Sequence, residues 1–173
     1  MHKPKEIKRG TKPKKLKHPA AVEVRSAKVE TRSYKATGLS VRKAANGDMQ
    51  LVGTEIVFDS PSQDLGNFTE IVRYQAAQRS LMRNSDVYML WQHDTSQPLA
   101  RTKAGSLKLT LTQTGLDFVA TLPNSPLGQN AYQSVANKVV DSVSFGFRIE
   151  PDGDTWQSDA QGNIVRELLD TGE

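Results

Sequence analysis

The sequence contains no cysteine, and this absence removes several classes of chemistry at once. Without a thiol the chain has no disulfide framework, no cysteine nucleophile and no thiolate metal site. It also lacks any apolar run near the ~18 residues that a membrane-spanning helix needs, and no hydrophobic segment follows the N-terminal charges as in a secretory signal. We therefore expect a protein that is made and used inside the cell, with no membrane partner.

Two further kinds of motif are missing. The sequence has no glycine-rich phosphate loop and no paired histidines at metal-ligand spacing, so neither mononucleotide nor zinc chemistry is expected. Aromatic residues make up only 6% of the chain and are scattered through the apolar pattern, which argues against a base-stacking surface for nucleic acid. We expect no metal and no cofactor.

Positive charge is concentrated at the N-terminus. Residues 1–18 contain eight lysines and arginines against Glu6, a net charge of +7, whereas the remainder of the chain has a net charge of −3. A like-charged block with several prolines cannot bury enough apolar surface to fold. We therefore expect a disordered basic tail over residues 1–20 and one folded domain over residues 21–173. The tail is either a solubilising leader or an electrostatic contact for nucleic acid or an acidic protein surface.

Short alternating patterns separated by turn signals dominate the rest of the chain, which favours antiparallel hairpins. Asn46-Gly47-Asp48 predicts the turn of one hairpin, and Gln113-Thr114-Gly115 predicts the turn of another. The most apolar run, at residues 86–91, is typical of a central strand. The expected strands lie at about 35–44, 49–58, 68–72, 86–91, 106–112, 116–122 and 143–149, followed by a last strand or short helix at 164–169.

Two segments have the spacing of amphipathic helices. The first is expected at about 74–83, and the second begins at Ser125-Pro126, which supply an N-cap and a first-turn proline, with a helical face extending to Val140. Together with about seven strands, these helices predict a mainly β (α+β) fold. The expected architecture is an antiparallel β-barrel or sandwich with the helices packed outside.

The candidate functional segment is Val143–Ile149. As a strand it has two distinct faces. The apolar face carries Val143, Phe145, Phe147 and Ile149, and the other face carries Ser144, Gly146 and Arg148. A glycine inside a strand often marks close approach of a ligand, which makes Ser144 a candidate nucleophile. A serine needs a base, and His93 is the one histidine between residues 21 and 173. The residues alone leave open that both are ordinary polar residues.

Several motifs together resemble the prohead proteases of tailed bacteriophages. The motifs stand in the same order as in that family, and the similarity runs from about residue 34 to residue 170. They are Asp59–Gly66, Glu70-Ile71, Trp91–Asp94, Leu99–Thr102, Gly105–Leu107 and Ser144–Arg148. The resemblance implies a fold similar to the herpesvirus maturation proteases. It also implies a serine endopeptidase that cuts scaffold and major capsid protein precursors, and itself, inside the assembling shell in the host cytoplasm.

The resemblance also implies roles for individual residues. Ser144 matches the family's nucleophile and His93 its general base, so His93 would take the serine proton and later protonate the leaving amine. Asp94 is expected to point away, because neighbours on an extended chain alternate faces. The family carries acids near its C-terminal strand, where this sequence has Glu167 and Asp170, and we favour Asp170 as the group that orients the imidazole.

Three further residues are candidates for holding substrate or the oxyanion. They are Arg101, Arg148 and Gly146. A guanidinium keeps its charge and donates several hydrogen bonds, and a glycine allows a ligand to approach the backbone. Arg148 is equally well explained as a solvated charge on a strand.

One departure from the family's pattern leaves an alternative open. The family continues past Leu168–Asp170 into another acidic and apolar segment, whereas this chain stops at Glu173, so the chain is truncated, has trimmed itself or lacks a piece of its site. The alternative function is a non-cleaving capsid-assembly or scaffold-associated factor that uses the basic tail. A nucleic-acid-binding β-barrel is a third hypothesis, which depends on the tail alone. Cleavage specificity and homo-oligomerisation are left open.

Overall fold

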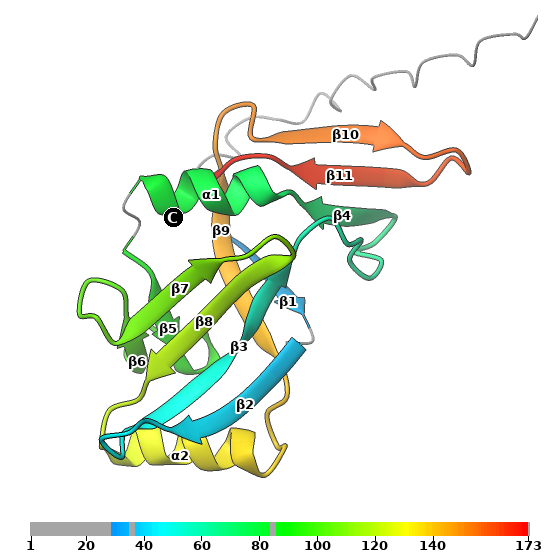
Figure 1. Ribbon diagram of the computed structural model, residues 1–173. Helices are drawn as coiled ribbons and strands as arrows, with labels where there is room; N and C mark the ends of the chain where they lie inside the picture. The colour runs from blue at the N-terminus through cyan, green and yellow to red at the C-terminus, as the bar shows by residue number, and fades with distance from the viewer. Residues whose placement is uncertain (1–28, 35–36, 84–85, 173) are drawn as a thin grey trace, which may run out of the picture.

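The computed structural model describes residues 29–34, 37–83 and 86–172, which form a mainly β fold with two α-helices (Figure 1). The basic tail predicted for residues 1–20 lies outside the described residues. The helices are α1 (Tyr74–Met82) and α2 (Pro126–Ala136), with a short 3₁₀ turn, η2 (Trp91–His93). The strands are β1 (Glu30–Tyr34), β2 (Thr37–Lys43), β3 (Met49–Val57), β4 (Phe68–Val72), β5 (Tyr88–Leu90), β6 (Pro98–Arg101), β7 (Leu107–Leu111), β8 (Gly115–Thr121), β9 (Val143–Ile149), β10 (Asp154–Ser158), β11 (Ile164–Leu168) and β12 (Thr171–Gly172).

The largest sheet has the order β2-β3-β8-β7, with every neighbouring pair antiparallel. Both predicted hairpins are therefore confirmed. In the first turn Gly47 has a φ of 89°, a conformation that glycine adopts without a steric penalty, and the Asn46 side chain accepts a hydrogen bond from the Asp48 amide at 3.2 Å. In the second turn the Thr112 amide donates to the Gly115 carbonyl at 2.9 Å.

Three smaller sheets complete the fold. Their strand orders are β1-β9-β12, β10-β11-β4 and β5-β6. The described strands thus pair into four sheets, and the predicted closure into a barrel is not confirmed. The strand count is higher than predicted, because β1, β6, β10 and β12 were not expected and residues 164–168 form a strand rather than a helix.

Two clusters of buried apolar residues form the core. The first lies between the largest sheet, β6 and α2, and includes Phe118, which is 2% exposed. The second lies where α1 and β9 meet β3, β4 and β11, and includes Leu168 and Ala76. Burying one large apolar side chain stabilises a fold by about 1.5 to 3 kcal/mol. Strands β3 and β8 contribute to both clusters and so join the two halves of the molecule.

The helices begin where predicted, but the residues at their C-terminal ends are more exposed than the apolar spacing predicted. The Ser125 hydroxyl accepts a hydrogen bond from the Gly128 amide at 3.4 Å, as expected of an N-cap. Helix α2 ends at Ala136 because Lys138 adopts a left-handed φ of 59°, a common helix termination. Val139 was predicted on the buried face and is instead 78% exposed, and Met82 of the first helix is 77% exposed.

Strand β5 is not the central strand that its apolar run predicted. It pairs only with β6 among the described strands, and Tyr88 is 47% exposed, with the Arg101 guanidinium 4.7 Å from its ring centroid. The alternate residues Val87, Met89 and Trp91 pack against the first core cluster. The run therefore has one buried face, and its other face is covered by an arginine instead of a second layer.

A buried network of charges attaches β1 to the neighbouring sheet. Glu70 on β4 has no exposed surface and accepts hydrogen bonds from Arg32 of β1 at 2.8 and 2.9 Å. Arg166 on β11 is 2% exposed and donates to Glu30 of β1 at 2.7 Å and to Asp154 at 2.8 Å. Charges this deep are tolerated because each has partners of opposite sign. The network holds β1 beside β9.

Candidate active site

Strand β9 occupies residues 143–149 as predicted and is the middle strand of its sheet. Phe147 and Ile149 are buried, while Phe145 packs against the second core cluster and Val143 against the first. Strand β1 runs antiparallel to β9 and places Ser33 opposite Ser144. The apolar face thus anchors the strand, and pairing with β1 fixes the register of Ser144.

His93 is presented by an unusual turn that directly follows β5. Gln92 and His93 both have left-handed backbones, with φ values of 53° and 58°, which L-residues adopt only where the surrounding structure compensates. The Trp91 amide donates to the Gln97 carbonyl at 3.0 Å, and the Asp94 amide donates to the Trp91 carbonyl at 3.0 Å. The backbone of the turn is therefore closed on both sides of His93.

Asp94 stabilises this turn with its side chain. Its carboxylate accepts hydrogen bonds from the Ser96 hydroxyl at 2.7 Å, the Ser96 amide at 2.8 Å and the Gln97 side-chain amide at 2.6 Å. These hydrogen bonds, with the Ser96 hydroxyl first, lower the pKa of Asp94 below its usual value. The acid next to His93 in sequence is thus engaged with its own loop.

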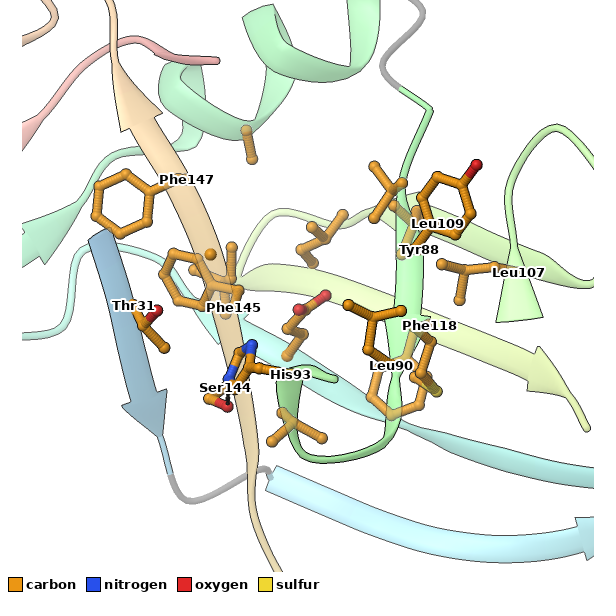
Figure 2. Close-up of a pocket in the computed structure, with 18 of the residues that line it drawn as sticks. Thr31, Tyr88, Leu90, His93, Leu107, Leu109, Phe118, Ser144, Phe145 and Phe147 are labelled. Carbon is orange, nitrogen blue, oxygen red and sulfur yellow. Dashed lines mark hydrogen bonds between the residues drawn. The ribbon is translucent and has the colours of Figure 1, made fainter. Parts of the chain in front are cut away.

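The structure brings the two candidate catalytic side chains together. A hydrogen bond joins His93 Nε2 to Ser144 Oγ, although the residues are 51 positions apart in the sequence. Figure 2 shows the imidazole and the hydroxyl facing each other between β9 and the turn after β5. This is the contact that a general base needs in order to take the proton of a serine nucleophile.

Ser144 and His93 line a pocket of about 790 Å³. Its walls come from β9, the β5 segment, the largest sheet and helix α1, and they are mostly apolar. The apolar side chains labelled in Figure 2 are Leu90, Leu107, Leu109, Phe118, Phe145 and Phe147. Pockets of this size and character are typical of sites that bury a side chain or small ligand.

The predicted oxyanion and substrate residues fall into two groups. Gly146 and Arg148 line the pocket with Ser144. A side chain at position 146 would begin 3.3 Å from Cγ1 of Val29, so the glycine permits the close approach of β1. Arg101, on β6, does not line the pocket among the described residues; it forms an ion pair with Asp86 instead.

The two acids predicted near the C-terminal strand are engaged by arginines. Glu167 on β11 accepts hydrogen bonds from Arg73 at 2.5 Å and from Gln157 at 2.6 Å. Asp170 forms an ion pair with Arg83 and lies 3.5 Å from an Arg79 nitrogen. Neither acid lines the pocket among the described residues. The structure therefore does not bring either carboxylate to the imidazole.

One pocket residue was missed by the sequence analysis. Glu55 lies on β3 and lines the same pocket as Ser144 and His93. Burial raises the pKa of its carboxyl from 4.5 to about 7. A signal was present in the sequence, because Glu55 falls on the same strand face as the core residue Leu51 when positions alternate. A charged residue at a core position of a strand is uncommon.

The described residues contain no group of three or more histidine, cysteine, aspartate or glutamate side chains placed to hold a metal ion. None of their helices is long and apolar enough to cross a membrane.

Comparisons with known proteins agree with the geometry. The sequence model of the family described as caudovirus prohead serine protease matches residues 37–171. Among solved structures, the capsid assembly protease gp21 of bacteriophage T4 is similar, with a TM-score of 0.53 and 8% sequence identity over 84% of this chain and 97% of that chain. No curated protein matches. At this identity the structural likeness shows a shared fold. The family match spans most of the chain and confirms the predicted resemblance, so this protein belongs to the family of caudovirus prohead serine proteases.

Proposed function

We propose that this protein is a serine endopeptidase in which Ser144 is the nucleophile and His93 the general base. It would cleave scaffold and major capsid protein precursors, and itself, within the assembling prohead in the host cytoplasm. The observation that carries the proposal is the hydrogen bond between His93 Nε2 and Ser144 Oγ at the edge of a pocket. The family to which the chain belongs supports the choice of peptide bonds as substrate.

The reaction follows from this contact. His93 accepts the Ser144 proton as the hydroxyl oxygen attacks the scissile carbonyl, and the tetrahedral intermediate carries a negative charge on the former carbonyl oxygen. The imidazolium then donates its proton to the leaving amine, which leaves an acyl-enzyme on Ser144. Water, deprotonated by the same imidazole, attacks the ester, and the imidazolium donates that proton to the Ser144 oxygen as the second product leaves. The serine proton thus ends on the product amine, and a proton from water restores the hydroxyl.

Arg148 is our candidate for stabilising the negative charge of the oxyanion. Arg148 stands on the same strand as Ser144 and lines the pocket, together with Gly146, where the backbone is accessible. A guanidinium near a developing oxyanion lowers the energy of the transition state in a site from which water is excluded. We propose Arg148 for this role in preference to Arg101, which does not line the pocket among the described residues.

The proposal needs only the serine and histidine. An acidic third member stays a prediction, because Glu167 and Asp170 are both held by arginines. The variants Glu167→Gln and Asp170→Asn test it. A catalytic acid would lower kcat while leaving unfolding by urea unchanged, whereas an acid that only anchors arginines would change stability first.

The decisive experiment is intact-mass analysis after coexpression with a capsid or scaffold precursor from the same phage. We expect defined fragments with the natural chain and none with Ser144→Ala or His93→Ala, since loss of either member of such a pair reduces kcat by about 10⁴-fold or more. Ser33→Ala is the matched control, because this exposed serine lies opposite Ser144 on the adjacent strand. Identical masses in all four samples would favour a non-cleaving assembly factor.

A further inference from the structure

Glu55 has no part in the chemistry proposed above, although it lines the same pocket. The lining is otherwise mostly apolar. Its other charged or titratable members among the described residues are Asp86, Tyr88, His93 and Arg148. The second acid, Asp86, is already paired with Arg101 and lies 3.4 Å from the Lys103 amine. Glu55 is therefore the pocket acid whose role is unassigned.

Alternation along β3 places Glu55 on the pocket face with Leu51, and an irregularity in the sheet turns Ile56 toward the same pocket. Thr54 pairs with Asp117 and Ile56 pairs with Leu116, so Glu55 is the extra residue of a β-bulge in β3. The neighbours Glu55 and Ile56 both line the pocket, which strict alternation along a strand would not allow. The Thr54 hydroxyl donates to the Asp117 carboxylate at 2.6 Å across the same strand pair. Bulges commonly redirect a side chain beside an active site.

No described residue provides Glu55 with a hydrogen bond or an ion pair, in contrast to Asp86. The carboxyl retains partial exposure, but enough protein surrounds it that burial raises its pKa to about 7. An ionised carboxylate in an apolar pocket is unfavourable unless a partner of opposite charge enters with it. The described residues therefore leave this carboxylate without a cationic partner.

We propose that Glu55 is a specificity-determining residue that receives the side chain of a lysine or arginine flanking the scissile bond of the substrate. This inference rests on the proposed function, because the same pocket must present the substrate to Ser144. The alkyl stem of the bound side chain would pack against the apolar wall that includes Leu90 and Phe118, and the cationic head would pair with the Glu55 carboxylate.

The lining of the pocket favours a cationic substrate side chain over an apolar or an acidic one. A purely apolar side chain would fill the space but leave the carboxyl without a partner, and an acidic side chain would be repelled by it. A long side chain with an apolar stem and a positive end packs against the apolar wall and also pairs with the carboxylate. The 790 Å³ volume accommodates either lysine or arginine.

The first test is a peptide library based on a precursor segment, with lysine, arginine, norleucine, glutamine or glutamate on either side of the scissile bond. We expect the natural enzyme to prefer lysine or arginine over norleucine, and Glu55→Gln to lose about a hundredfold of that preference in kcat/KM. Asp117→Asn is the matched control, since it removes a carboxylate that Thr54 already engages. Equal preference in the natural enzyme and Glu55→Gln would overturn the inference and leave the Ser144–His93 proposal standing.

A second test does not require cleavage. In the Ser144→Ala variant, the Glu55 carboxyl is followed by carbon-13 NMR as pH is varied in the presence of n-butylammonium or of the neutral n-butanol. We expect n-butylammonium to bind more tightly than n-butanol and to lower the pH at which Glu55 titrates. Equal binding of the two probes would overturn the inference whether or not the enzyme is active.

Discussion

Replacing Glu55 with glutamine should stabilise the protein, and the gain should depend on pH. The folded state holds a proton on Glu55 up to about pH 7, whereas an unfolded chain releases it near 4.5. The folded state therefore binds more protons across this interval, so the natural protein loses stability as pH rises from about 4.5 to 7. At about 1.4 kcal/mol for each pKa unit, the full penalty is about 3 kcal/mol above pH 7.

Urea unfolding followed by circular dichroism at pH 5 and pH 8 measures this difference. Because urea slopes for small proteins are about 1 to 3 kcal/mol per molar, Glu55→Gln should raise the midpoint at pH 8 by about 1 to 2 M more than at pH 5. Asp159→Asn should instead lower the midpoint by the same amount at pH 5 and pH 8. Hydrogen bonding, chiefly from the Asn163 side chain, lowers the pKa of Asp159 from 3.8, so its contribution is present at both pH values and is lost only in stronger acid.

A gain of equal size at the two pH values would refute the reasoning, since the benefit would then come from packing rather than ionisation. Destabilisation by Glu55→Gln at pH 8 would also refute it, because that result requires a favourable partner for the carboxylate in the unliganded protein.

Three further predictions test separate parts of the structure. Glu70→Gln should destabilise the fold by about 3 kcal/mol in urea unfolding, because it removes the buried carboxylate that Arg32 and Arg166 share; a loss below about 1 kcal/mol would contradict this. Gln92→Val should cost about 1 to 2 kcal/mol and slow cleavage, because a β-branched residue is strained at a φ of 53°; an unchanged urea midpoint would contradict it. Arg148→Met should lower kcat in a peptide assay by about a hundredfold, whereas Arg101→Met should leave kcat nearly unchanged; equal effects would argue against an oxyanion role.

The parts of the fold that sequence reasoning predicted well are those set by local signals. Strand β9 and its two faces followed from alternation alone, and the two hairpins followed from their turn residues. The start of α2 followed from Ser125-Pro126. In each case neighbouring residues determine the backbone, so no knowledge of distant contacts was required.

The parts that were missed depend on contacts between distant segments. Strand β1 is rich in polar residues and has no clear alternation, and it is held in place by ion pairs of Arg32 and Glu30 with residues about 40 to 140 positions away. Helix α2 ends early because Lys138 turns left-handed, which its apolar spacing did not signal. Such pairings become visible only after the chain has folded.

Only part of the candidate site was predictable from the sequence. Ser144 and His93 were identified from the residues and from the family resemblance, and the structure joins them by a hydrogen bond. The placement of Glu55 follows from alternation with Leu51, but no turn or periodicity signal marks the bulge in β3 that brings Ile56 to the same pocket. The pairing of Arg101 with Asp86 likewise arises from tertiary contact.

The proposed nucleophile and base belong to separate parts of the fold. Ser144 lies on β9 of the sheet β1-β9-β12, whereas His93 lies in the turn between β5 and β6. A displacement of about 1 Å between reacting groups can reduce a rate by about a hundredfold. If Ser144 and His93 act as proposed, a shift of that size between the sheet β1-β9-β12 and the β5-β6 segment would stop cleavage while every strand stayed intact. A mutation remote from both residues would then abolish cleavage without lowering the melting temperature, provided that it changed the alignment of the two segments.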